Sequence, residues 1–216
     1  MSAVLFDFDF TLGDSSKAIL ECIRYALESC DLPVPDEQTM LSTVGMSLND
    51  TFSLLAPGAP LQRLKELFIE RGDQVMVDSA WLYDGVPELM SALRDRGYRI
   101  GIVTTKFRRR IERILEKGGV TQLVDVIVGF EDVAEPKPDP EPIELALRRL
   151  GCEKESATYV GDSVIDAEAA ASAGVKFIAV LTGTTTADEL SQHKALAVVN
   201  DLTGLLDFFP AVRAPS

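Results

Sequence analysis

The chain has 216 residues, 46% of them hydrophobic, and its 21 Lys and Arg against 34 Asp and Glu give a formal net charge of −13. A chain of this length and apolar content can bury a full core, and its negative field argues against a nucleic-acid-binding protein. No apolar run approaches the roughly 18 residues of a membrane span, so we expect no membrane partner.

The first predicted element is a buried strand, the apolar run at residues 3–6. Two carboxylates, Asp7 and Asp9, stand where this run ends. Open α/β sheets bind ligands beyond the carboxyl ends of their strands, so the pair lies where chemistry is usually placed. Buried like charges are costly without a cation or a shared proton. On its own, however, the pair also fits a helix N-cap or a solvated turn, and the rest of the chain must decide.

A helical segment follows this strand. Asp14-Ser15-Ser16 is typical of a helix N-cap, and apolar residues then recur at helical spacing from Ile19 to Leu27. Further helices are predicted at residues 37–43, 48–55 and 61–76, with breaks at Gly45 and at residues 57–60. No convincing strand is found between residues 14 and 80.

From Trp81 onward, strands and helices alternate. We predict strands at residues 99–104, 124–128, 157–160 and 175–181, and helices at residues 86–96, 108–117, 140–150 and 163–173. Such alternation implies right-handed crossovers and a sheet covered by helices on both faces. The predicted fold class is therefore α/β, with a doubly wound, mostly parallel sheet. Residues 1–13 and 81–216 would form the Rossmann-like core, and residues 14–80 an inserted α-helical cap over the crevice, where a lid can exclude water.

Further polar residues stand at the ends of the predicted strands. Thr104 closes one strand, Lys137 lies in a proline-rich loop, and Asp162 and Asp166 follow another strand. Carboxylates for a divalent cation, a hydroxyl and an ammonium form an inventory for phosphoryl transfer, in which catalysis is mainly positioning and charge neutralisation.

At this point the chain resembles the haloacid dehalogenase superfamily of phosphatases. Four motifs carry the resemblance in the family's order: Asp7-Phe8-Asp9-Phe10-Thr11, Thr104, Lys137-Pro138-Asp139-Pro140 and Gly161-Asp162-Ser163-Val164-Ile165-Asp166. The helical insert matches the family's first cap position. Asp9 matters within the first motif, because the dehalogenase branch lacks this second acid and halide displacement is therefore disfavoured.

The resemblance implies a role for each motif residue. Asp7 would attack phosphorus and form an aspartyl-phosphate, while Asp9 would protonate the leaving oxygen and then deprotonate water. Mg²⁺ would be bound by carboxylate oxygens of Asp7 and Asp162 and by the main-chain carbonyl of Asp9. Thr104 would donate to the phosphoryl group, and Lys137 would offset charge between the nucleophile and the phosphate.

Other residues are expected close to the site. Asp166 would support the metal ligands or act as an additional acid near the metal; alternatively it is a first-turn acid favoured by the helix dipole. Thr105 and Lys106 are expected to contact substrate phosphate. Gly45, in a cap segment similar to that of phosphoglycolate phosphatases, would approach the substrate or serve as a turn glycine.

Two features depart from or extend the family pattern. Phe10 stands where many relatives carry glycine, which predicts either a loop held differently or packing of the ring between core and cap. Residues 108–110 are three arginines that can draw in anionic substrates, but we interpret them mainly as a solvated helix face.

The predicted function is Mg²⁺-dependent hydrolysis of a small phosphorylated metabolite, with phosphoglycolate as the first choice of substrate. Inorganic pyrophosphate, a sugar phosphate and a nucleoside monophosphate stand behind it. A sugar-phosphate mutase is less favoured, because the family's cap histidine is replaced by Ile19. A phospho-accepting receiver module is a remote alternative, since receivers have another chain order and no helical insert.

The cysteines and the N-terminus bear on localisation. Cys22, Cys30 and Cys152 form no C-x-x-C pair and leave one thiol unpaired in any disulfide scheme, which favours a reducing, cytoplasmic setting. The chain enters its first predicted strand without a basic leader. The sequence leaves the oligomeric state open.

Overall fold

The structure is a computed structural model that describes residues 2–212. Its centre is a six-stranded, wholly parallel sheet in the order β5-β4-β1-β6-β7-β8. The α/β class and the doubly wound sheet predicted from the sequence are thereby confirmed. The strands are β1 (Ala3–Phe6), β4 (Arg99–Val103), β5 (Val126–Val128), β6 (Ala157–Gly161), β7 (Lys176–Val180) and β8 (Ala197–Val199).

Helices cover both faces of this sheet because its strands alternate their side chains between two apolar layers. Within β1, Val4 and Phe6 face one layer, and Ala3 and Leu5 face the other. The first layer packs against α5 (Val86–Asp95), α6 (Arg108–Lys117) and the 3-10 helix Leu202–Phe208. The second layer packs against α7 (Glu141–Leu150), α8 (Val164–Ala173) and α9 (Ala187–Ser191).

The direction of winding reverses at β1, which pairs with β4 on one side and with β6 on the other. The chain runs outward from β1 through β4 to β5 and then returns to β6, β7 and β8. Crevices outside the carboxyl ends of strands at such a switch point are the usual ligand sites of open α/β sheets. The acidic residues that follow β1 and β6 lie at this point.

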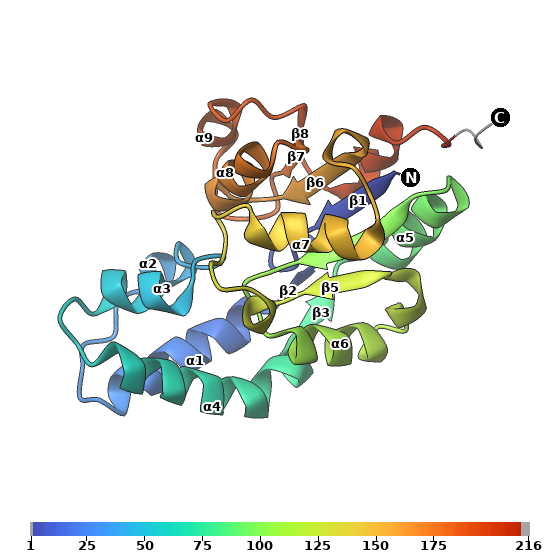
Figure 1. Ribbon diagram of the computed structural model, residues 1–216. Coiled ribbons are helices and arrows are strands. Elements are labelled where there is room, and N and C mark those ends of the chain that lie inside the picture. The colour runs from blue at the N-terminus through green and yellow to red at the C-terminus, as the bar shows by residue number, and fades with distance from the viewer. Residues whose placement is uncertain (1, 213–216) are drawn as a thin grey trace.

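Four helices form an insert at that end of the sheet (Figure 1). They are α1 (Ser16–Glu28), α2 (Glu37–Leu41), α3 (Leu48–Leu55) and α4 (Leu61–Ser79). They have an apolar core of their own, which includes Ile23, Met40, Phe52 and Leu64. The insert therefore packs around its own buried side chains and is positioned to cover the crevice.

Three short strands are absent from the sequence prediction. β2 (Gly13–Asp14) and β3 (Trp81–Leu82) pair antiparallel and tie the two ends of the insert together. The expectation of no strand between residues 14 and 80 is therefore wrong at Asp14, the last residue of β2. β8 adds a sixth, edge strand beside β7. Within residues 2–212, no helix combines the length and apolar character needed to cross a membrane.

Candidate active site

The Lys137 ammonium joins the nucleophile motif to the last acidic motif. Lys137 is buried and donates to Asp7 Oδ1 at 2.8 Å, to Asp166 Oδ1 at 2.6 Å and to the Tyr159 hydroxyl at 2.9 Å. An ammonium has three donors. All three donors are thus engaged. One lysine holds both the Asp7 carboxylate, which follows β1, and the Asp166 carboxylate, which lies in α8.

Asp166 is held by the start of α8 as well as by the lysine. Its Oδ2 accepts from the Ser163 backbone N–H at 3.1 Å and from the Ser163 hydroxyl at 2.6 Å, which completes a capping box. Tyr159, fully buried in β6, places its hydroxyl 3.0 Å from Asp166 Oδ1 and 3.0 Å from the Val103 carbonyl oxygen. Both carboxylate oxygens of Asp166 therefore accept hydrogen bonds from the protein.

Asp162 completes a group of three buried carboxylates. Asp7, Asp162 and Asp166 each offer an oxygen, and these oxygens all lie within 4.8 Å of one another. Thr11 donates to Asp162 Oδ1 at 3.3 Å. Gly183 makes room on the other side, since a Cβ there would lie 1.8 Å from Asp162 Oδ2. The absence of a side chain at Gly183 thus makes room for the Asp162 carboxylate.

Burial and mutual repulsion shift the pKa values of this cluster. Burial raises the pKa of Asp7 to about 7; Lys137 opposes the rise, and Asp166 adds to it. Burial also holds the pKa of Asp162 well above its usual range, with Asp166 and Asp7 adding to it. Burial alone would lower the pKa of Lys137, but Asp166 and Asp7 outweigh it and raise that pKa. One ammonium is too little charge for three carboxylates, so the group favours a further cation.

This shift predicts how the stability of the metal-free protein depends on pH. Asp7 has an ordinary pKa of 3.8 and a pKa of about 7 in the fold, so between these values the folded state binds more protons than the unfolded state. The stabilisation is complete below pH 4 and is lost as pH rises through 7, with a slope of at most about 1.4 kcal/mol per pH unit. Urea unfolding in EDTA between pH 4 and 8 measures it. Asp7→Asn should remove this contribution, and equal slopes in both proteins would contradict the assignment.

Asp9 points to different partners. Its Oδ2 accepts from the Lys106 ammonium, and its Oδ1 accepts from the Ser15 hydroxyl at 2.5 Å. Ser15 is the residue before α1, but its side chain makes no capping hydrogen bond there. The expected N-cap role of this cluster is therefore replaced at Ser15 by a contact with Asp9. The two acids of the opening motif are held by separate cations, Lys137 and Lys106.

The remaining predicted residues fall into two places. Thr104 follows β4 and is buried, and its hydroxyl accepts from the Lys106 backbone N–H at 3.2 Å. Thr105, Lys106 and Gly45 line one cavity together with Asp9. Gly45 has a φ of +94°, and a Cβ on it would lie 3.9 Å from the Ser163 hydroxyl oxygen. The glycine is therefore both a turn residue and the point where the cap approaches the acidic loop.

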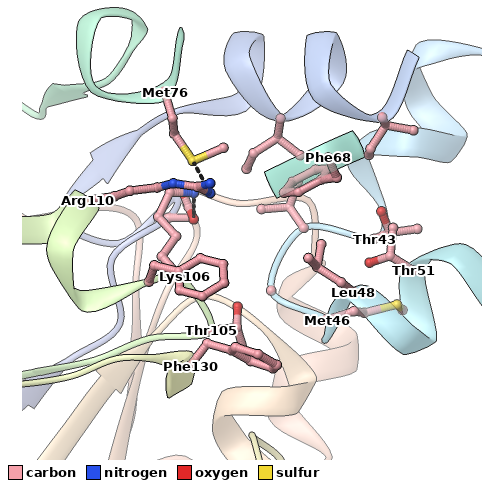
Figure 2. Close-up of a pocket in the computed structure, with 16 residues that line it drawn as sticks. Thr43, Met46, Leu48, Thr51, Phe68, Met76, Thr105, Lys106, Arg110 and Phe130 are labelled. Atoms are coloured by element: carbon pink, nitrogen blue, oxygen red, sulfur yellow. Dashed lines mark hydrogen bonds and ion pairs between the residues drawn. The ribbon is translucent and has the colours of Figure 1, made fainter. Parts of the chain in front are cut away.

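This cavity, between core and cap, has a volume of ≈ 50 Å³ (Figure 2). It is small beside the roughly 300–1,000 Å³ of ordinary small-molecule sites. Its lining is mainly apolar, with side chains from α1, from the loop before α3, from the first residue of α3 and from α4: Ile19, Ile23, Val44, Met46, Leu48, Phe68 and Met76. In this arrangement the cap leaves space for a small group beside Asp9.

Phe10 adopts the conformation that glycine would. Its φ is +58°, in the left-handed region, which costs a non-glycine residue roughly 1–3 kcal/mol. The residue is 9% exposed, and its carbonyl accepts from the Thr182 hydroxyl. The chain therefore keeps the tight turn with a buried aromatic residue in place of glycine.

Comparison with known proteins identifies the family. Residues 4–180 match the family described as haloacid dehalogenase-like hydrolase. The chain belongs to this family. Membership in the haloacid dehalogenase-like hydrolases confirms the resemblance carried by the four motifs, and it leaves the receiver-module alternative without support.

Individual relatives agree with this membership along the whole chain. Pyrophosphatase PpaX of Bacillus velezensis is 32% identical over 213 residues, 95% of each chain. A solved structure from Bacteroides fragilis, assigned as a haloacid dehalogenase-like hydrolase, superposes with a TM-score of 0.91 at 35% identity over 94% of this chain and 99% of that one. Another, from Lactobacillus plantarum and assigned as a phosphoglycolate phosphatase, gives 0.83 at 26% identity, covering 96% and 99%.

The donor set fits the Mg²⁺ expected of a haloacid dehalogenase-like hydrolase. Mg²⁺ prefers oxygen ligands, and the three clustered side chains, Asp7, Asp162 and Asp166, are all carboxylates. Among the described residues, the Asp9 carboxylate is outside this group. That agrees with its contacts to Lys106 and Ser15, and metal binding by its main-chain carbonyl stays a prediction.

Three residues escaped the sequence analysis. Tyr159 lies in a predicted apolar strand, where an aromatic residue normally signals core packing. Ser15 carried the signal of a helix cap. Arg110 was assigned with its neighbours to a solvated helix face, but it is buried at 3% exposure. Arg110 falls in the register of the buried face of α6, with Ile111 and Ile114, and that spacing was the available signal.

Proposed function

We propose that this haloacid dehalogenase-like hydrolase is a Mg²⁺-dependent phosphatase that cleaves a small phosphorylated metabolite through an aspartyl-phosphate on Asp7. The observation that carries the proposal is the separation of the two acids. Asp7 lies in the buried carboxylate cluster on Lys137, whereas Asp9 lines the cavity under the cap. This separation supports different roles for the two acids, with Asp7 acting on the phosphoryl group and Asp9 on the leaving group.

The reaction follows in two displacements. An Asp7 carboxylate oxygen forms a bond to phosphorus as the bond from phosphorus to the leaving oxygen breaks, and Asp9 gives that oxygen its proton. Asp9 then takes a proton from water, whose oxygen attacks phosphorus and releases phosphate and the free Asp7 carboxylate. Bound Mg²⁺ supplies positive charge that lets two anions meet. The Lys137 ammonium keeps the Asp7 carboxylate oriented, and Thr104 donates to a phosphoryl oxygen.

For the substrate we favour inorganic pyrophosphate. Sequence analysis places phosphoglycolate first, but the PpaX relative, matched over 95% of both chains, is named as a pyrophosphatase. Two cationic side chains, Lys106 and Arg110, line the cavity, and its ≈ 50 Å³ suit a leaving group of few atoms. Phosphoglycolate is the second candidate, supported by the assignment of the Lactobacillus plantarum structure. A mutase is less favoured, because Ile19 offers no proton to the cavity that it lines.

A substrate panel tests this proposal. We expect phosphate release from pyrophosphate to show the highest kcat/KM, phosphoglycolate to follow, and sugar phosphates and nucleoside monophosphates to be at least about tenfold poorer, because the cavity admits only small groups. EDTA should abolish turnover, and Mg²⁺ should restore it. Ca²⁺ serves as a matched control for charge without the octahedral preference. Full activity in EDTA, or a nucleoside monophosphate as the best substrate, would contradict the proposal.

The cysteines bear on the setting in which this activity would operate. Cys22, Cys30 and Cys152 are free thiols. Burial raises the pKa of the Cys22 thiol to about 12, so that group is unreactive near neutral pH. Three free thiols, of which the Cys22 thiol is unreactive, support the reducing, cytoplasmic setting that we propose.

A further inference from the structure

Arg110 is a buried core arginine whose side chain reaches the cap. It belongs to the first turn of α6, yet only 4% of its side chain is exposed, whereas the neighbouring Arg109 side chain is 51% exposed. Its guanidinium lies against α4 of the insert. A charged side chain is rarely buried to this degree unless it is paired, and the pairing of Arg110 is incomplete.

One edge of the guanidinium is held by α4. Arg110 Nε and Nη2 donate to Asp73 Oδ1 at 2.9 and 2.7 Å, and Nη2 also donates to the Ile69 carbonyl at 2.8 Å. Gly72 makes this approach possible, because a Cβ there would lie 2.8–2.9 Å from the guanidinium carbon and nitrogens. A glycine inside a helix costs about 1 kcal/mol relative to alanine. The space that Gly72 leaves for the Arg110 guanidinium explains why a glycine is present in α4.

The other edge of the guanidinium faces the cavity without a strong acceptor. Among residues 2–212, the partner of Arg110 Nη1 is the Met76 sulfur at 3.7 Å, and a thioether accepts hydrogen bonds weakly. Figure 2 shows Met76 beside the guanidinium, with Lys106 on the same side of the cavity. A planar guanidinium with free donors is suited to the oxygens of carboxylate or phosphate.

The charges of the cavity lining also favour the binding of an anion. The lining contains two cations, Lys106 and Arg110, and one acid, Asp9, which Lys106 already pairs. Asp73 is outside the lining and 45% exposed, so it compensates Arg110 from the solvent side. The cavity thus keeps one excess positive charge within apolar walls. Because Asp9 protonates the leaving oxygen in the proposed reaction, this charge lies on the leaving-group side.

We propose that Arg110 recognises an anionic group carried by the leaving group, and that Gly72 and Asp73 position it for that purpose. The inference rests on the proposed function and deepens it. Both substrate candidates fit, since pyrophosphate leaves as a second phosphate and phosphoglycolate leaves with a carboxylate. Arg110 therefore determines specificity for phosphoryl compounds whose leaving group is itself anionic.

The test compares these two substrates with ethyl phosphate, whose small leaving group carries no further anion. Loss of a charge-assisted hydrogen bond should lower kcat/KM of Arg110→Gln for pyrophosphate and phosphoglycolate by about 10- to 100-fold more than for ethyl phosphate. Whichever of pyrophosphate and phosphoglycolate shows the larger loss of kcat/KM identifies the anion, phosphate or carboxylate, that the arginine binds. Equal losses for all three substrates would overturn the inference and leave Arg110 as a contact between cap and core.

Two further variants keep the test independent of folding defects in Arg110→Gln. Gly72→Ala retains the guanidinium but displaces it from its position against α4, so it should reduce the preference for anionic leaving groups. Because alanine favours the helix, this loss would not come from a weaker α4. Arg109→Gln is the matched control. Arg109 also pairs with Asp73 and also lies over the Phe107 ring, but it does not line the cavity, so its loss should leave the selectivity unchanged.

Binding measurements separate failure of this inference from failure of the proposed function. By calorimetry with Mg²⁺, the wild-type protein should bind methylenediphosphonate about 10- to 100-fold more tightly than methylphosphonate, and Arg110→Gln should lose this preference. If the wild-type protein hydrolyses no panel substrate, the proposed function fails, while this comparison still decides the role of Arg110. If hydrolysis is normal and the preference survives in Arg110→Gln, only the inference fails.

Discussion

Asp7→Asn is expected to lower kcat by at least about 10⁴-fold for every substrate while leaving the fold intact. Asparagine fills nearly the same volume but has no carboxylate oxygen to attack phosphorus. Lys137 keeps Asp166 and the Tyr159 hydroxyl as partners, so the buried ammonium is not left alone. Phosphate release measured with Mg²⁺, together with circular dichroism, checks both parts of this expectation.

A second acid provides the control for Asp7→Asn. Asp36 is an exposed N-cap of α2 that accepts from the Thr39 N–H at 2.9 Å. Asparagine caps helices as well as aspartate does, so Asp36→Asn should change neither activity nor stability. Acid quenching during turnover should trap phosphate on the wild-type chain and none on Asp7→Asn. Phosphate trapped on another residue, or normal turnover of Asp7→Asn, would remove Asp7 from the role of nucleophile.

The parts of the fold that sequence patterns predicted are those with long, regular signals. The five predicted strands follow apolar runs, and the alternation of strand and helix after Trp81 determined the parallel sheet. β2 and β3 have two residues each, and β8 has three. Such segments are too short for a period of two to be recognised. These strands pair because the packing of the elements around them brings them together. That packing is a property of the tertiary structure and leaves no local pattern in the sequence.

In the candidate active site too, the sequence located some residues but not the contacts of others. The acids, the threonine and the lysine could be located because parallel strands bring their carboxyl ends to one edge, so position along the strand implied proximity. The contacts of Ser15, Tyr159 and Arg110 depend on how the insert and the strands approach one another. A serine before a helix, a tyrosine in a strand and an arginine in a basic run each have a common local explanation. Their actual partners are 6, 22 and 37 positions away.

Lys137→Met should destabilise the metal-free protein by about 3–5 kcal/mol at pH 8, and it should lower kcat/KM by about 10³-fold. The methionine side chain is of similar length but carries no charge, so Asp7 and Asp166 would face each other without the ammonium that now binds both. Lys137 opposes the rise that burial causes in the pKa of Asp7, so without the ammonium Asp7 would bind its proton still more tightly in the fold. The loss should therefore be smaller at pH 5, where protonation relieves the repulsion, and should grow as pH rises.

Urea unfolding at pH 5 and pH 8, in EDTA and in Mg²⁺, measures these effects. Because the same carboxylates are the proposed metal ligands, saturating Mg²⁺ should recover part of the stability, while the loss of turnover should persist. Lys154→Met, at an exposed lysine, is the control and should change stability by less than about 0.5 kcal/mol. A loss that is equal at both pH values and unaffected by Mg²⁺ would mean that Lys137 acts through packing. In that case its charge would not be what holds the carboxylate cluster together.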